Sequence, residues 1–334
     1  MKKIIITLIS LVMLTSMFSS LVSAQEEMTS EQMQAVFDDY QKNYIGKTYT
    51  YKDWVYSPEA GFTYNNDYDP INAEITGMYI VFVIDKYNNK NATSVKIPSS
   101  IDGHKISGIG GRFKSNTKLK KATYSNGLKS TGVYAFKNHK NLRKVILPKS
   151  ITNISIESFH NCKKLEKVTL PKNTVIHNRA FKDCKNLKTL EYKGTSEFDS
   201  IIFYGAKKGE TRIGEEAFAN CVKLQKINLG KTREIEDNAF ENCRSLKSIT
   251  LPKNMTAICD EAFLDCKKLS KVTVKSQKDI LGIGEDAFEN TKKGIKFYVK
   301  NKKVAKSLKK QLKGSGVRNA KILIGKKVVY KNVK

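Results

Sequence analysis

The chain of 334 residues lacks several patterns that would point to an enzyme or to a membrane-spanning protein. Beyond the N-terminus, no segment has the roughly 18 consecutive apolar residues of a membrane span. The four histidines show no paired spacing such as H-E-x-x-H, and neither a G-x-S-x-G elbow nor a glycine loop that cradles phosphate is present. The sequence therefore predicts no catalytic residues, no cofactor and no metal site.

The first 24 residues have the pattern of a secretory signal peptide. Lys2 and Lys3 precede an apolar stretch from Ile4 to Leu14, and the small residues of "VSAQ" end at Ala24 before a polar segment. We expect cleavage after Ala24 and an extracellular or cell-surface location for the mature chain. An uncleaved N-terminal anchor is the alternative. Position 25 is Gln, so a lipoprotein anchor is not expected.

Positive charge dominates the composition, with 60 Lys and Arg against 32 Asp and Glu. Removal of Lys2 and Lys3 lowers the formal net charge from +28 to +26. This balance predicts attraction to an anionic glycan, a cell-wall polymer, an acidic protein or a membrane surface. The alternative is a solvated surface of lysines without a specific ligand. No nucleic-acid recognition motif is present, so no specific nucleic-acid partner is expected.

A repeat of about 23 residues fills most of the chain. Eight units align on a phenylalanine, and in the first seven a leucine follows six residues later, as in Leu142 after Phe136. The steps between these phenylalanines are 23, 23, 22, 37, 22, 23 and 25 residues. The aligned residues are Phe113, Phe136, Phe159, Phe181, Phe218, Phe240, Phe263 and Phe288. A fixed period of this length predicts a solenoid of stacked coils.

Each unit carries an L-x-x-V-x-L pattern, as in Leu165, Val168 and Leu170. Alternating apolar residues of this kind predict one short parallel strand per coil. The rest of each coil, such as "IGEEAF" ending at Phe218, is too short for a full helix, so 3-10 or irregular turns are expected on that convex side. The predicted fold is a leucine-rich repeat solenoid, an α/β-type superhelix that is mostly β and is capped at both ends.

The repeat closely resembles the BspA-like class of bacterial leucine-rich repeats. The resemblance rests on the proline after the strand in "LPKS" and "LPKN", and on segments such as "IGEEAFANC" that recur in register over residues 79–297. It implies a secreted or surface protein that acts in adhesion or protein binding and is not a catalyst. Residues 95–110 are similar to the first coil of that class.

Two columns of outward-pointing residues are expected on the concave face of the strands. Side chains alternate between the faces of a strand, so the residues two and four positions after each leucine point away from the core. The first column holds Lys121, Lys144, Lys167, Thr189, Lys226, Ser248 and Lys271, and the second holds Thr123, Ile146, Thr169, Glu191, Asn228, Thr250 and Thr273.

Lysines about 4.8 Å apart on neighbouring strands repel one another, and an extended polyanion would relieve this repulsion. The candidate binding residues are therefore Lys121, Lys144, Lys167, Lys226, Lys271, Thr169, Thr250 and Thr273. The alternative is that the lysines splay into water and the threonines only favour strands.

Five of the six cysteines share one position of the repeat, three residues after the phenylalanine: Cys162, Cys184, Cys221, Cys243 and Cys266. Stacking brings such residues to roughly 5 Å between Cα atoms, within reach of a disulfide, which an oxidising exterior permits. Side chains that point in parallel cannot surround a zinc ion tetrahedrally. We expect a structural ladder of buried free thiols, with disulfides as the alternative.

Residues 25–78 are expected to cap the first coil. An amphipathic helix is predicted over residues 29–44, where Thr29 and Gln32 have the spacing of a capping box. An aromatic-rich stretch over residues 49–68 follows. Its rings are expected to pack on the cap, and stacking on sugar rings is the alternative.

Residues 298–334 are expected to cap the other end with a helix and a strand. Val304, Leu308 and Leu312 share one face of the predicted helix, and the strand is expected at residues 321–324. The lysines of this helix suggest an anionic membrane surface as an alternative contact.

The 37-residue step between Phe181 and Phe218 contains an insertion at about residues 191–210. Such an insertion maps to one edge of a repeat array as a loop. Its apolar residues are candidates for a contact patch or for packing on the array: Phe198, Ile201, Ile202, Phe203 and Tyr204.

The sequence thus predicts a secreted, non-enzymatic protein that binds macromolecules through its sheet and acts in adhesion or protein–protein interaction. The expected partner is an extracellular protein, an anionic glycan or a cell-wall polymer. The alternative is a structural, wall-associated protein held to anionic polymer by bulk positive charge. We expect a monomer.

Overall fold

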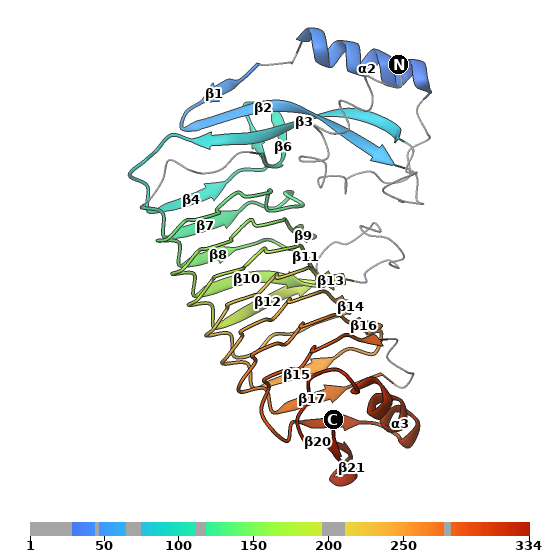
Figure 1. Ribbon diagram of the computed structural model, residues 1–334. Helices are drawn as coiled ribbons and strands as arrows, with labels where there is room; N and C mark the ends of the chain where they lie inside the picture. Colours follow the sequence, from blue (N-terminus) through green and yellow to red (C-terminus); the bar gives the residue numbers. More distant parts are fainter. Residues whose placement is uncertain (1–28, 44–46, 65–74, 111–117, 196–210, 277–281) are drawn as a thin grey trace.

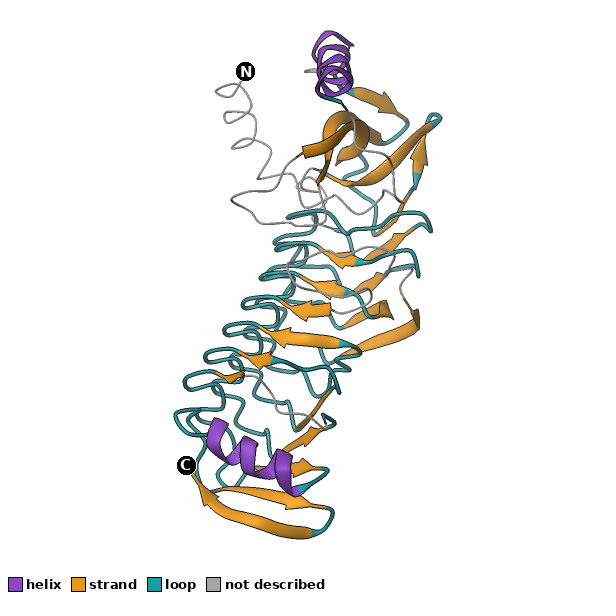
Figure 2. Cartoon of the chain, turned by 90° about the vertical axis from the view of Figure 1, so that its right-hand side faces the viewer, coloured by secondary structure: helices purple, strands orange, loops and turns teal. Residues whose placement is uncertain are grey.

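The structure is a computed structural model, and it describes residues 29–43, 47–64, 75–110, 118–195, 211–276 and 282–334. The chain winds into a long stack of coils, with one helix near each end of the described residues (Figure 1). Strands and loops alternate along the whole stack (Figure 2). The predicted solenoid is therefore confirmed.

The longer strands lie along one side of the stack and form two five-stranded sheets. The first sheet has the order β12-β10-β8-β7-β4 and the second the order β15-β17-β19-β20-β21. All neighbours are parallel except β20 and β21. The strands are β4 (Ser94–Ile97), β7 (Lys121–Tyr124), β8 (Lys144–Ile146), β10 (Lys167–Lys172), β12 (Thr189–Thr195), β15 (Ser248–Leu251), β17 (Lys271–Val274), β19 (Lys296–Val299), β20 (Ala320–Ile324) and β21 (Lys327–Val333).

A second parallel sheet runs along another side of the stack, where the repeat pattern predicts only turns or irregular segments (Figure 1). Its six short strands are β9 (Asn153–Ile154), β11 (Val175–Ile176), β13 (Thr211–Ile213), β14 (Thr232–Ile235), β16 (Ala257–Ile258) and β18 (Gly282–Ile283). An isoleucine ends each strand and pairs with the isoleucine of the next coil. The stacking of these residues aligns the backbones, which the sequence of a single coil does not reveal.

Tight turns, as expected, connect this sheet to the cysteines. Two residues in each turn have left-handed backbone angles, for example Asn238 with φ 54° and Asn242 with φ 58°. The turns are hydrogen-bonded from coil to coil, since the N–H of Phe240 donates to the carbonyl of Ala262 at 2.8 Å. Asn and Asp tolerate left-handed angles better than most residues, which explains the "FxN" and "FxD" segments of the repeat.

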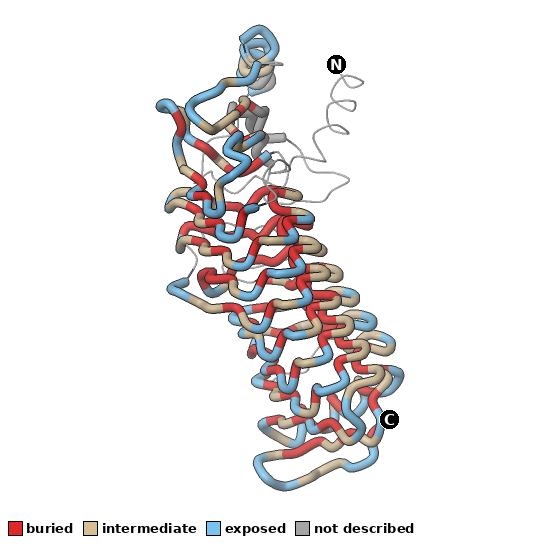
Figure 3. The backbone as a smooth tube through the Cα atoms, turned by 90° about the vertical axis from the view of Figure 1, so that its left-hand side faces the viewer, coloured by how far each residue is buried: buried red, intermediate tan, exposed pale blue. Residues whose placement is uncertain are grey.

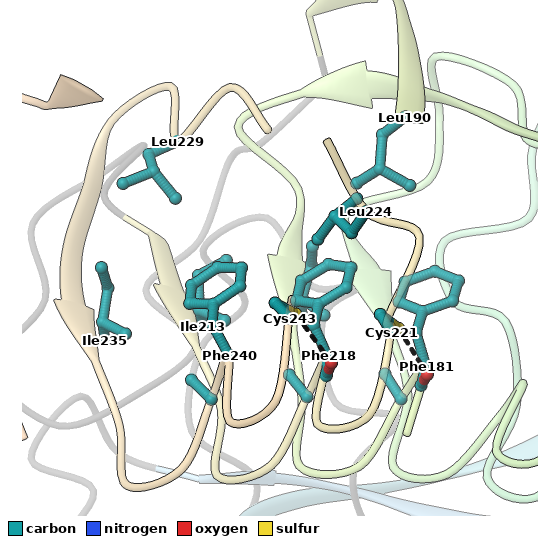
Figure 4. Packing of buried hydrophobic residues seen from close by; sticks show 14 of the residues in the cluster. Phe181, Leu190, Ile213, Phe218, Cys221, Leu224, Leu229, Ile235, Phe240 and Cys243 are labelled. Atoms are coloured by element: carbon teal, nitrogen blue, oxygen red, sulfur yellow. Dashed lines mark hydrogen bonds between the residues drawn. The ribbon is translucent and has the colours of Figure 1, made fainter. Parts of the chain in front are cut away.

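The repeat phenylalanines from Phe136 to Phe288 form one stacked column in the core (Figure 4), and Phe113 lies outside the described residues. Between Phe136 and Phe288 neighbouring ring centroids are 5.2 to 5.8 Å apart, and the rings are within 14° of parallel. Tyr124 meets one end of the column edge-on and Phe297 meets the other. The column joins the coils into one core, and buried residues run the length of the stack (Figure 3).

The cysteine ladder lies beside this column (Figure 4). All five of its side chains are completely buried and are free thiols. Each Sγ donates a hydrogen bond to the carbonyl oxygen of the repeat phenylalanine in the preceding coil, as from Cys243 to Phe218 at 3.3 Å. Each of these carbonyls also accepts a backbone N–H from its own coil, as Phe218 does from Cys221, so the ladder supplies a second donor per coil in an apolar interior.

The N-terminal part combines a helix with a separate sheet of order β1-β2-β3-β6-β5. Helix α2 (Ser30–Asn43) begins with the expected capping box, in which Thr29 and Gln32 exchange hydrogen bonds of 2.8 and 3.2 Å. The strands are β1 (Tyr49–Tyr51), β2 (Trp54–Tyr64), β3 (Ile75–Tyr87), β5 (Ser100–Ile101) and β6 (His104–Ile109).

The C-terminal part is a helix packed beside the last strands. Helix α3 (Lys302–Gln311) begins at Asn301, whose side chain accepts the N–H of Val304 at 2.9 Å. Leu308 and Leu312 are buried with Val304, as the apolar spacing predicts.

The expected region boundaries after residues 78 and 297 fall within β3 and β19. The end of β3 pairs in parallel with β6, and β19 pairs with both β17 and β20. Both end regions thus share strands with the array.

Candidate binding site

The outward residues of the longer strands form the surface that we call the sheet face. The burial of successive residues alternates in β7, β15 and β17, so the residues of the two columns point outward there, whereas in β10 the second-column residue Thr169 is buried. Lys121, Lys226 and Lys271 are exposed, and Lys144 and Lys167 are half-buried.

Strand register places the lysines of the first column directly beside one another. Lys144 pairs with both Lys121 and Lys167. At the other end, Lys296 pairs with both Lys271 and Lys321, which extends the column by two lysines that the leucine spacing misses. Gly294 replaces the repeat leucine of the coil with Lys296, and Lys321 lies in the cap. Lys296 lies eight residues after Phe288, and this spacing could have revealed it from the sequence.

The lysine column is interrupted in the middle. The first sheet ends at β12 and the second begins at β15, and the coil between them contributes only an isolated bridge between Thr189 and Lys226. The prediction of one strand in every coil is therefore wrong for this coil. Three positions, Thr189, Lys226 and Ser248, separate the two groups of adjacent lysines.

Lys167 differs from its neighbours because it has a carboxylate partner. Its Nζ lies 2.5 Å from Oε1 of Glu191, and this interaction holds the pKa of Glu191 below its ordinary value. Thr169 lies beside this ion pair, with its hydroxyl 3.5 Å from the Glu191 carboxylate. This threonine is only 5% exposed. Thr169 is thus poorly placed to contact a ligand.

The other predicted residues are open to solvent to different degrees. Thr250 is exposed and Thr273 is half-buried. The Nζ of Lys271 lies 4.9 Å from the centre of the Tyr298 ring, a cation–π contact that orients the amine. Within the described residues, Lys144, Lys226 and Lys296 make no ion pair.

The insertion candidates Phe198, Ile201, Ile202, Phe203 and Tyr204 lie outside the described residues. The aromatic stretch is described in part. Tyr56 is buried, and its ring stacks on Tyr49 at 5.4 Å and lies near Phe82 and His104. The rings of the described part therefore pack mainly on one another, and Tyr51 remains exposed.

The buried thiols are poorly suited to nucleophilic chemistry. Burial raises the pKa of each ladder thiol well above its ordinary value, which suppresses the reactive thiolate. Cys259 is half-buried, and burial together with Asp237 and Glu236 raises its pKa to about 11.

Within the described residues, no three His, Cys, Asp or Glu side chains are grouped so that they could hold a metal ion. His177 is buried, which lowers its pKa to about 3, and its Nε2 lies 3.3 Å from Oδ1 of Asn153. Of the helices in the described ranges, none has the length and apolar character needed to cross a membrane.

The repeat architecture agrees with a known family. A family model described as the BspA type leucine rich repeat region, with 6 copies, matches residues 85–210 and 206–312. The chain belongs to this family. The match spans the stacked coils and reaches α3, so most of the described structure is BspA-type repeat. No curated protein matches the chain.

Several solved structures of bacterial leucine-rich repeat proteins are similar. A protein from Bacteroides ovatus is 18% identical with a TM-score of 0.46, and the match covers 83% of this chain and 71% of that chain. The T. pallidum protein TpLRR is 20% identical with a TM-score of 0.41, covering 73% and 89%. The pneumococcal vaccine antigen PcpA is 16% identical with a TM-score of 0.26, covering 85% and 100%.

Proposed function

We propose that this chain is a secreted, non-catalytic repeat protein that binds an anionic macromolecule through the lysines of its sheet face and acts in adhesion or attachment. The observation that carries the proposal is the register of the strands, which aligns Lys121 with Lys144 and Lys271 with Lys296. Adjacent ammonium groups on neighbouring strands repel one another. An extended polyanion laid across the strands would offset this repulsion.

Membership of a repeat family supports binding as the general activity, because stacked repeats provide an extended surface. An anionic glycan, a cell-wall polymer and an acidic protein surface all carry the required charge. The competing proposal is attachment by bulk charge, which the net charge alone would supply: +28 for the full chain and +26 without Lys2 and Lys3.

Retention on an immobilised heparin or wall-polymer column separates these two proposals. One variant replaces Lys144, Lys226, Lys271 and Lys296 with Gln, and a matched control replaces four exposed lysines of α3: Lys302, Lys303, Lys306 and Lys310. Both variants lose four positive charges. We expect the sheet-face variant to elute at clearly lower salt than the control, because its lysines act together. Equal shifts would favour bulk charge.

The ion pair of Lys167 provides a test in the opposite direction. Because Glu191 already neutralises Lys167, replacing both residues of the pair with Gln should change retention less than Lys144→Gln. Glu191→Gln should release Lys167 and strengthen retention. Weaker retention of the Glu191→Gln variant would contradict a role for the sheet face.

A further inference from the structure

The interruption between β12 and β15 leaves two strand edges inside the array. Strand β12 pairs only with β10, and β15 pairs only with β17, as far as the described strands extend. The intervening coil forms its single bridge at Lys226 and then departs from the strand path. One edge of β15 is therefore without a paired strand.

A change in the repeat accounts for this departure. Tyr192 occupies the position that Leu170 holds in the preceding coil. Tyr192 and Asn228 line the same small pocket between the coils, so the phenol lies beside the segment that would otherwise pair with β12. Two residues later, Gly230 has a left-handed φ of 57° at the position of Pro171. The coil is thus held away from a regular strand.

A cleft of about 470 Å³ opens where the ladder is missing. Residues 227–231 line one side, and Thr250, residues 252–254 and Lys275 line the other. Leu229 and Pro252 are buried, while Asn228 and Thr250 are exposed. Pockets of roughly 300–1,000 Å³ are the size of typical ligand sites.

Three lysines from successive coils surround the cleft. Lys231, Lys253 and Lys275 are all exposed lining residues, and none forms an ion pair with any described residue. Lys253 and Lys275 follow the carboxyl ends of β15 and β17, whereas the lysines of the column lie at the amino ends of their strands. The cleft therefore combines one residue of the unpaired edge of β15, Thr250, with three available ammonium groups.

We propose that this cleft binds an extended acidic peptide segment, which pairs with the free edge of β15 and places carboxylates beside Lys231, Lys253 and Lys275. Addition of a peptide strand to a sheet edge is an established mode of recognition, in which main-chain hydrogen bonds supply affinity. Of the four residues of β15, Thr250 lines the cleft, so the peptide would pair with β15 at this position. This site is separate from the lysine column and does not depend on it.

Binding to the full chain can be measured by fluorescence anisotropy with a blocked hexapeptide that alternates glutamate and valine. Two further peptides carry N-methyl groups on the odd or on the even amides, which keeps the charge and removes one set of donors. Only one set of amides faces a given strand edge. We expect one methylated peptide to lose at least about tenfold in affinity and the other to bind nearly as well as the parent.

Two variants of the protein test the site itself. Replacing Lys231, Lys253 and Lys275 with Gln should weaken hexapeptide binding at least about tenfold, whereas the matched variant of Lys302, Lys303 and Lys306 should not. Tyr192→Leu restores the residue of the other coils, and should weaken hexapeptide binding while heparin retention persists.

The proposal is overturned if both methylated peptides bind as tightly as the parent, because binding would then need charge alone. Tighter binding of a hexuronate oligosaccharide of equal charge would also overturn it and would assign the cleft to an anionic glycan. The variant of Lys144, Lys226, Lys271 and Lys296 should keep hexapeptide binding. Failure of the lysine column and failure of the cleft are thus distinguishable.

Discussion

Alkaline pH should destabilise this protein through its five buried ladder thiols. Burial raises the folded-state pKa of each thiol well above the ordinary value. Above the unfolded pKa of about 8.5, the unfolded chain releases thiol protons that the folded chain retains. The stability contribution is therefore complete below about pH 8.5 and is lost as the pH rises.

The magnitude follows from proton linkage. One pH unit above the unfolded pKa, each buried thiol lowers the free energy of unfolding by RT ln(1 + 10), about 1.4 kcal/mol. Five such thiols lower it by about 7 kcal/mol. The total stability of a folded protein is about 5–15 kcal/mol, so the folded state should become marginal near pH 9.5.

Urea denaturation with reducing agent, at several values between about pH 7 and pH 9.5, measures this effect. The comparison variant is Cys243→Ala, which removes one thiol and leaves the tyrosines and lysines unchanged. Its free energy of unfolding should fall less steeply, by about 1.4 kcal/mol per pH unit at the alkaline end. Equal pH slopes for the two proteins would refute the linkage.

Three more outcomes are expected. Phe240→Ala should lower the free energy of unfolding by about 3–5 kcal/mol. The Phe240 ring is buried, and its centroid lies 5.3 Å from that of Phe218 and 5.2 Å from that of Phe263. A loss below about 1 kcal/mol would show that the column is not a continuous core. Asn242→Ala should cost about 1–2 kcal/mol at φ 58°, and Asn242→Gly clearly less, as measured by urea denaturation. In native protein at neutral pH, an alkylating reagent should modify only Cys259, and slowly. In denatured protein, intact mass should show six labels. Labelling of the ladder in native protein would contradict its burial.

Much of the interior could be predicted from the sequence. The register of Phe240 and Cys243 repeats from coil to coil, and a repeated spacing in a stack places equivalent residues in equivalent environments. The capping box at Thr29 and the apolar face of α3 depend on residues within a few positions of one another, so local pattern was sufficient. The cleft could not be predicted, because its walls come from coils about 22 residues apart.

The solenoid, the buried ladders and the outward column of lysines could be predicted from the sequence, because each follows from a fixed period and from alternation along a strand. The environment of that column depends on contacts between coils. The tertiary structure paired Lys167 with Glu191, extended the column to Lys321, and opened the ladder beside Tyr192. Each of these depends on a contact between coils at one position, and a deviation at one position has no period from which it could be predicted.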